Sequence, residues 1–231
     1  PDVLFVVAAG NENIDNDLEY TTPAYLARFY PNVITVAATR PGDAICGFSN
    51  WGLDSVDIGA PGEDILSTVI PEAPVYMNGT SMAAPYVAGV AALVRALAPT
   101  MTAAELRRLM AYTARDIEQL HHYVSSGGVI DREILKGLVQ GTPRARSNAQ
   151  ARVAINASLL SDSLYPRHAE DARIAADKAM QLDGTNVEAW RAKAQLLTVA
   201  GDQEKALEAI ERAVALDPRS EPAWMDRAAI T

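Results

Sequence analysis

The chain has 231 residues, of which 49% are hydrophobic and 21% are charged, and its formal net charge at pH 7 is −9. This length suits one or two domains, and the apolar share is large enough to form a buried core. The negative charge argues against a nucleic-acid partner, because nucleic-acid-binding surfaces are basic. The single cysteine, Cys46, excludes a disulfide within the chain, and we expect it to be a small buried side chain.

The charge is distributed unevenly along the chain. Residues 1–138 carry 8 Lys/Arg against 16 Asp/Glu, whereas residues 139–231 carry 12 against 13. Between the two halves, the stretch QGTPRARSN (140–148) is polar and basic, a composition typical of a flexible linker. The sequence therefore predicts a first domain at 1–138, a linker at 139–152 and a second domain at 153–231.

The first domain begins with short apolar runs that predict strands. Val3–Ala9, Val33–Thr39 and Val56–Ile58 are β-branched and continuously apolar, as strands buried on both faces of a parallel sheet are. The segment Met82–Ala98 is apolar all round, which predicts a central helix packed inside the domain. These elements indicate an α/β layered domain.

Two features refine the helices of this domain. Pro85, Gly89 and Arg95 interrupt the apolar segment, so we expect it to be too short to span a membrane, and no other span is expected. We also expect Pro85 to fall in the first helical turn, where a missing N–H is tolerated. The residues Thr102 to Glu105 have the pattern of a capping box, which predicts the start of a second, amphipathic helix.

A short polar stretch, Asn78-Gly79-Thr80-Ser81, runs directly into the apolar helix. The simplest interpretation is that Thr80 or Ser81 only caps the helix. The other interpretation is catalytic: at a helix N-terminus, free backbone N–H groups and the helix dipole favour negative charge on a reaction intermediate. A second polar residue, Asn11, follows Gly10 at the end of the first predicted strand, where ligands meet open α/β sheets.

Four stretches decide between these interpretations. They are VVAAGNEN (6–13), YPNVITVAAT (30–39), FSNWG with VDIGAPG (48–62) and NGTSMAAPYVAGVAAL (78–93). In this order they resemble the subtilisin-like serine peptidases, the subtilase family. The resemblance covers residues 1 to about 138 and implies a three-layer α/β fold with a parallel sheet, of which the N-terminal part is missing here.

The resemblance also implies roles for individual residues. Ser81 would be the nucleophile, and Asn11 would supply the side-chain amide of an oxyanion hole, with the backbone N–H of Ser81 as the second donor. Thr80 and the segment Ala8-Ala9-Gly10 would assist this hole and form a wall of the pocket for the residue before the scissile bond. The substrate would be a polypeptide.

The chain departs from the family in its histidines. Subtilases carry the catalytic Asp and His upstream of the serine, but His121, His122 and His168 all follow Ser81. We expect the Asp and His to precede Pro1 in a longer protein. The alternative is a protein that never had them. His121 and His122 are expected to be a solvated surface pair.

Other candidate sites in the first domain are weaker. Glu12, Asp15, Asp17 and Glu19 form an acidic cluster, and subtilases often carry calcium, but the spacing lacks the regularity of an EF-hand loop. The expected chemistry requires no metal or cofactor. A calcium ion with a purely structural role is an alternative that the sequence leaves open. Trp51 is expected to pack in a turn.

The second domain repeats with a period of 34 residues. Such a period with helix–turn–helix patterning resembles the tetratricopeptide repeat, which implies a protein partner. One full repeat is predicted at Val187–Ser220, a preceding one at about Val153–Asn186 matches only in its second half, and another begins at Glu221. The pairs that reveal the period are Ala172 and Ala206, Ala179 and Ala213, Leu182 and Leu216, Asp183 and Asp217, and Trp190 and Trp224.

The sequence supports three functions. The leading hypothesis is a serine endopeptidase of secreted or cell-envelope location, with repeats that bind a partner, substrate or regulator. The second is a catalytically inactive scaffold that works through its repeats. The third is a repeat adaptor in which the α/β domain has no role of its own.

Overall fold

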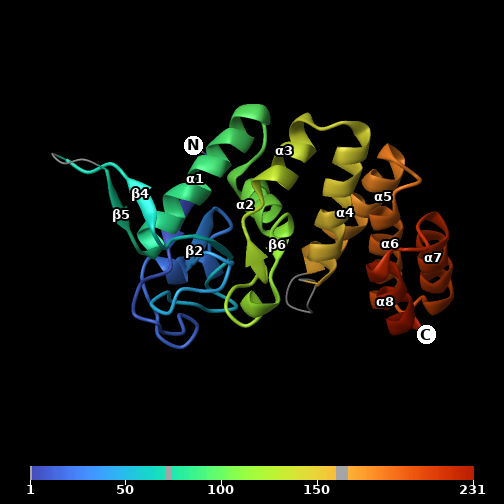
Figure 1. Cartoon of the computed structure of the whole chain (residues 1–231), viewed down its shortest axis with the longest axis horizontal. Helices are drawn as coiled ribbons and strands as arrows, with labels where there is room; N and C mark the ends of the chain where they lie inside the picture. Colours follow the sequence, from blue (N-terminus) through green and yellow to red (C-terminus); the bar gives the residue numbers. More distant parts are fainter. Residues whose placement is uncertain (1, 71–73, 160–165) are drawn as a thin grey trace. The chain divides into compact units, whose positions relative to one another are not determined.

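The computed structural model describes residues 2–70, 74–159 and 166–231 (Figure 1). The chain divides into two compact units, Pro1–Arg132 and Glu133–Thr231, which are described separately below. This division falls a few residues before Leu138, the predicted end of the first domain. A division into compact units does not test where a domain ends, so the predicted domain boundaries remain predictions.

The first unit is built on a five-stranded sheet. Its strand order is β1-β2-β3-β7-β6, in which β1, β2, β3 and β7 are parallel and β6 is antiparallel to β7. The predicted strand Val33–Thr39 is β2 to the residue, and every residue in it is buried because β1 and β3 flank it. The strands span Phe5–Ala8 (β1), Val33–Thr39 (β2), Ile58–Pro61 (β3), Arg115–Asp116 (β6) and Gly128–Val129 (β7).

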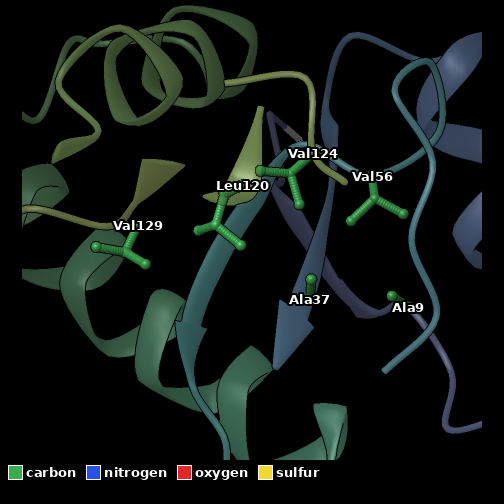
Figure 2. Close-up of a cluster of buried hydrophobic side chains, with 6 residues drawn as sticks. All are labelled: Ala9, Ala37, Val56, Leu120, Val124 and Val129. Carbon is green, nitrogen blue, oxygen red and sulfur yellow. The ribbon is translucent and has the colours of Figure 1, made fainter. Parts of the chain in front are cut away.

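One cluster of the buried core lies against this sheet. In this cluster Ala9, which follows β1, and Ala37, which lies in β2, pack with Val56 and with residues of the segment after the second helix (Figure 2). The six members are Ala9, Ala37, Val56, Leu120, Val124 and Val129. Small residues on the strands leave room for the larger side chains of that segment.

The apolar segment forms α1, which spans Thr80–Leu97 and packs against β1, β2 and β3. The expectation that it is buried all round is wrong, because only 39% of the helix is buried. The sequence also led us to expect a segment too short and too interrupted to span a membrane, but by length and composition alone α1 is long and apolar enough to do so. The core helix of a soluble protein can meet the same two criteria. Pro85 lies beyond the first turn, so the carbonyl of Ser81 lacks its usual partner within the helix.

The second helix, α2, spans Ala103–Tyr112, and its predicted capping box is confirmed. The Glu105 N–H donates to Thr102 Oγ1 at 3.2 Å, and the Thr102 N–H donates to the Glu105 carboxylate at 2.7 Å. These bonds lower the pKa of Glu105, the backbone bond having the largest effect. The capped end fixes where α2 begins and hence which of its side chains face the sheet.

The first unit contains further short elements that the sequence did not indicate. A hairpin of β4 and β5 leads into α1, and its strands pair antiparallel with Leu66 opposite Tyr76 (Figure 1). The segments Ala24–Arg28 and Glu118–Leu120 are short 3₁₀ helices, η1 and η2. The hairpin strands are Ile65–Ser67 (β4) and Val75–Met77 (β5).

The second unit is helical throughout the part that the structure describes. The predicted flexible linker is wrong for most of its length, since residues from Pro143 onward belong to a helix that packs against the next one. Buried polar bonds hold this pair to the following repeat: the Asn186 amide donates to Ser147 Oγ, which donates to the Ala179 carbonyl. The helices are Arg132–Gln140 (α3, which begins at the unit boundary), Pro143–Leu159 (α4), Pro166–Leu182 (α5), Val187–Val199 (α6), Gln203–Leu216 (α7) and Glu221–Ile230 (α8).

The predicted full repeat is confirmed as the hairpin of α6 and α7. Gly201 has φ 78°, which makes the turn, and Asp202 caps α7. The two period-marking tryptophans make the same bond, because each indole N–H donates to a carbonyl six residues earlier: Trp190 to Gly184 and Trp224 to Pro218. Their role in the structure is to fasten each first helix to the turn before it.

Candidate active site

Ser81 lies in the first turn of α1 and is exposed to solvent. The N-cap residue is Gly79, which has no side chain, so the interpretation of Thr80 or Ser81 as a helix cap is wrong. The first four N–H groups of a helix have no partner within it, and the N–H of Ser81 is one of them. Ser81 therefore presents a hydroxyl and a backbone donor that no described residue of the chain engages.

Asn11, which follows β1, is bonded to the residue beside Ser81. The Thr80 N–H donates to Asn11 Oδ1 at 2.9 Å, and the Thr80 hydroxyl lies 3.0 Å from the same oxygen. A backbone N–H can only donate, so the oxygen of the amide must face Thr80 and the nitrogen must face away. Within the described residues no acceptor is bonded to that nitrogen, and Asn11 is exposed.

Thr80 is fully buried and joins the end of β1 to the start of α1. Its hydroxyl oxygen lies 3.2 Å from the Gly10 N–H, which donates to it. Gly10 has φ 114°, a conformation that other residues rarely adopt, and a Cβ there would collide with the Asn50 amide. The Asn11–Thr80 geometry thus depends on a glycine at position 10.

Asn50, a residue to which the sequence assigned no role, holds the turn that carries Asn11. Its Oδ1 accepts from the Glu12 N–H at 2.8 Å and from the Ile14 N–H at 3.3 Å. Its Nδ2 donates to Asn16 Oδ1 at 3.1 Å, and Asn16 in turn donates to the Ala9 carbonyl. Asn50 and Asn16 are both fully buried. The FSNWG motif was the available signal, but it does not say which backbone groups the asparagine would meet.

Replacing Asn50 by alanine is expected to lower the free energy of unfolding of the chain by about 1–3 kcal/mol, because buried N–H groups lose their acceptor. Urea unfolding followed by tyrosine and tryptophan fluorescence measures the change. Asn32→Ala is the matched control, since the Asn32 amide makes one exposed bond, to the Val3 carbonyl. An equal effect of the two substitutions would contradict the positioning role of Asn50.

The remaining predicted pocket residues lie at the end of β1. Ala8 is its last residue and is half-buried, whereas the Ala9 side chain is fully buried in the core cluster (Figure 2). A substrate could therefore contact only the backbone at Ala9.

The described residues bring no base to Ser81. No hydrogen bond to the Ser81 hydroxyl is formed by the part of the chain that the structure describes. His121 is exposed, and its Nε2 lies 2.6 Å from Asp116 Oδ1. Cys46 offers no alternative nucleophile, because its thiol is buried and burial is the main cause that raises its pKa to about 11.

The acidic turn after Asn11 is the place where the sequence left a structural calcium ion open. The Glu12 carboxylate accepts from the Asn11 N–H and from the Asn50 amide, and Asp15 Oδ1 accepts from the Asp17 N–H. Residues 2–70, 74–159 and 166–231 contain no group of three or more His, Cys, Asp or Glu that could hold a metal. The Glu12 and Asp15 carboxylates thus hold backbone and amide groups in and beside the turn. Trp51 packs edge-on against Tyr123 with ring centroids 5.6 Å apart, as a turn residue is expected to.

A serine at a helix N-terminus, beside an amide at the end of a parallel strand, is typical of α/β serine hydrolases. The family model of the subtilase family matches residues 1–152, and a tetratricopeptide repeat model matches residues 187–230. The chain belongs to the subtilase family.

Several proteins are similar to this chain. "Extracellular protease" of Xanthomonas campestris is 46% identical over 120 residues, which are 48% of this chain and 19% of the relative. "Extracellular basic protease" of Dichelobacter nodosus is 35% identical over 183 residues, 74% of this chain and 28% of the relative. The solved structure of a self-cleaved protease domain of PatA is 30% identical, with a TM-score of 0.49 over 61% of this chain and 51% of that chain. The chain spans less than a third of the curated relatives it matches.

Proposed function

We propose that the chain is the nucleophile-bearing part of a serine endopeptidase. The observation that carries the proposal is the orientation of the Asn11 amide: Thr80 engages its oxygen, which leaves Nδ2 to donate to a substrate oxygen. The Ser81 N–H is the second donor. Two fixed donors favour the negative charge that develops on the carbonyl oxygen of a substrate peptide.

The proposed reaction proceeds through an acyl-enzyme. Ser81 Oγ attacks the carbonyl carbon of the scissile bond while a base takes its proton, and the oxyanion is held by Asn11 Nδ2 and the Ser81 N–H. The intermediate collapses, and the base returns the proton to the leaving amine. Water then attacks the acyl-enzyme through the same two steps and releases the carboxylic acid product from Ser81. A histidine and an aspartate from outside residues 1–231 supply and orient this base.

The substrate and the setting follow from the same site. An extended polypeptide would lie along the Ala8-Ala9-Gly10 backbone, with Gly10 permitting close approach and Thr80 supporting the hole. Two of the similar proteins are named extracellular proteases, which supports a secreted or cell-envelope location. The chemistry needs no metal or cofactor.

The repeats are proposed to bind a protein partner, which selects substrates or regulates cleavage. The second candidate function is an inactive scaffold that acts through the repeats alone, and the lack of a described base beside Ser81 is the observation that favours it. A fluorophosphonate probe, which reacts with activated serines, separates the two functions. The full-length natural protein should be labelled and its Ser81→Ala variant should not, whereas a scaffold would stay unlabelled in both forms.

Asn11→Ala in the full-length protein is expected to lower kcat for a short peptide by about 10²–10³-fold and to leave KM nearly unchanged. This magnitude is the one known for the equivalent donor in subtilisin, a member of the same family. The loss falls on kcat because the donated bond matters mainly once charge has developed. Steady-state kinetics measure both constants, and a rise in KM alone would contradict the oxyanion role.

Removing the repeats after Gly141 is expected to change hydrolysis of a short peptide by less than about twofold. The cut precedes Pro143 because α4 packs against α5 and so belongs to the helical array. The peptidase unit has its own core cluster, and stacked repeats draw their stability mainly from their neighbours. Kinetics of the truncated full-length protein test this. Loss of short-peptide activity would show that the units are one functional structure.

A further inference from the structure

Asn16 is a buried polar side chain to which the proposed reaction assigns no role. It lies in the acidic turn after Asn11 and is fully buried. Its Nδ2 donates to the Ala9 carbonyl at 2.8 Å, and its Oδ1 accepts from Asn50 Nδ2 at 3.1 Å. Burying an amide costs free energy unless its polar atoms are bonded. Both ends of the Asn16 amide are therefore engaged inside the protein.

The orientation of the Asn16 amide follows from its neighbours. The N–H groups of Glu12 and Ile14 can only donate, so Asn50 Oδ1 faces them and Asn50 Nδ2 is left to donate. Asn16 must then offer its oxygen to Asn50 and its nitrogen to the Ala9 carbonyl, which can only accept. No other orientation satisfies both ends.

Asn16 holds one side of a peptide unit whose other side is held by Thr80. The Ala9 C=O and the Gly10 N–H belong to one planar trans unit, in which they point in opposite directions. We name this unit the 9–10 peptide. Its carbonyl accepts from Asn16, and its N–H donates to Thr80 Oγ1 at 3.2 Å. The plane is thus fixed from both sides.

The 9–10 peptide is a unit that can turn over if it is not held. Gly10 has φ 114°, and glycine adopts positive and negative φ about equally readily, so its backbone resists the turn little. The flanking groups are anchored independently of the 9–10 peptide. The Ala9 side chain lies in the core cluster (Figure 2), and the Ala9 N–H donates to the Val36 carbonyl at 3.0 Å. The Gly10 carbonyl accepts from the Asn50 N–H at 2.9 Å.

A turned 9–10 peptide would disturb the proposed oxyanion hole. As the plane stands, the Gly10 N–H donates to the Thr80 hydroxyl oxygen, and the hydroxyl can donate to Asn11 Oδ1, 3.0 Å away. After the turn, the Ala9 carbonyl would face Thr80 in place of the N–H. Because a carbonyl only accepts, it would draw the single hydroxyl proton away from Asn11. The Asn11 amide would then lose one of the two Thr80 bonds that orient it.

We propose that Asn16 is a positioning residue for the peptidase reaction. By holding the 9–10 peptide, it directs the Thr80 hydroxyl to Asn11 Oδ1, and Asn11 Nδ2 stays turned toward the substrate oxygen. Asn16 is buried and touches no reacting atom, so it acts only through these groups. This inference rests on the proposed function, because the oxyanion role of Asn11 belongs to that function.

The test is a double-mutant cycle of kcat in the full-length natural protein with a short peptide as substrate. Asn16→Leu keeps a side chain of similar size and removes the donor to Ala9. Asn50 retains its bond to the Glu12 carboxylate at 3.0 Å. The substitution should lower kcat at least about tenfold and change KM less than about threefold, because Asn11 acts on charge that develops in the transition state. In the Asn11→Ala background it should lower kcat less than about threefold, since the amide through which it acts is already absent.

Asn32→Leu is the matched control. The Asn32 amide also donates to a backbone carbonyl, that of Val3 at 3.0 Å, but this bond lies at the end of β1 away from Asn11. It should leave kcat unchanged in both backgrounds. An equal fall of kcat on Asn16→Leu in both backgrounds would overturn the positioning role, because Asn16 would then support only the fold. Asn16→Ser, a smaller change, should give the same cycle and decides the matter if the leucine variant does not fold.

Hydrogen exchange of the Gly10 amide separates this inference from the proposed function. Mass spectrometry of overlapping peptides from the full-length protein should show exchange at least about tenfold faster in Asn16→Leu than in Asn32→Leu, because a turned 9–10 peptide loses its bond to Thr80. Unchanged exchange with unchanged kcat would overturn the inference and leave the function intact. If the wild-type protein is not labelled by the fluorophosphonate probe, the function fails and the reaction role of Asn16 fails with it. The Gly10 exchange then still decides whether Asn16 holds the peptide.

Discussion

Ser81→Ala in the full-length protein is expected to lower kcat for a short peptide by about 10⁶-fold, the loss known for the nucleophile of subtilisin and carried over here as a family magnitude. Without the hydroxyl no acyl-enzyme can form, and only the oxyanion donors remain to act on water. The fold should be unaffected, because Ser81 is exposed and the described residues make no bond to its hydroxyl. Stopped assays with a chromogenic peptide measure the loss, and the melting temperature reports on the fold.

Thr100→Ala is the matched control, since it removes an exposed hydroxyl just after α1 and should leave kcat unchanged. The 231-residue chain on its own should show no more than residual hydrolysis, because it has no described base beside Ser81. Strong Ser81-dependent hydrolysis by that chain would mean that it contains a base. Activity that survives in Ser81→Ala would identify a different nucleophile.

The sequence predicted the strands best where both faces are buried. The boundaries of β2 are those of its apolar run, because every residue of that strand faces the interior. The run Val56–Ile58 only overlaps β3, which extends to Pro61. Val56 is buried in the core but lies before β3, and an apolar run alone does not distinguish a buried strand residue from a buried residue beside the strand. The paired residues of β6 and β7 are too few to leave any periodicity.

The helices show the opposite limit. The stretch QGTPRARSN has the composition of a linker, yet most of it is the start of α4, which packs against α5 and α6. Tertiary packing overrides local composition there. In the full repeat, by contrast, the small residues, the glycine turn and the helix caps all favour the same helical hairpin, and the predicted hairpin is correct.

For the candidate site, the family resemblance predicted which residues would be near one another, and the structure supplies how they are bonded. Asn11 and Thr80 are 69 positions apart, and no local pattern relates them. Asn50 lies 38 positions from Glu12 in the segment it supports, so its role appears only in three dimensions. Long-range polar contacts of this kind leave no periodic signal in a single sequence.

The buried ion pair of Asp57 and Arg107 is a further contact of this kind, and it links the sheet to α2. Arg107 Nη2 lies 2.7 Å from Asp57 Oδ1, and Nε donates to the same oxygen at 3.0 Å. The Thr35 N–H donates to Asp57 Oδ2 at 2.7 Å, and Arg107 also donates to the Tyr30 carbonyl. Burial is the largest influence on the Asp57 carboxyl and raises its pKa, whereas Arg107 and the Thr35 N–H act in the lowering direction.

Arg107→Met is expected to lower the free energy of opening of the first unit by about 3–5 kcal/mol at neutral pH, because it leaves the Asp57 charge buried without its partner. The loss should depend on pH. Without Arg107 the folded-state pKa of Asp57 rises further above its unfolded value, so the folded state binds the extra proton and stability falls as pH rises through that window. The deficit relative to the wild type should therefore be small near about pH 4 and largest above neutrality.

Amide hydrogen exchange of β2 and α2, followed by mass spectrometry between about pH 5 and pH 8, measures this opening within the first unit. The double variant Asp57→Asn with Arg107→Met should recover much of the loss, because the amide oxygen still accepts from Thr35 and no charge remains buried. The same substitution pair should also remove most of the pH dependence. A deficit in Arg107→Met that stays constant across this range would mean that lost packing of the arginine stem, and not the stranded carboxylate, is its cause.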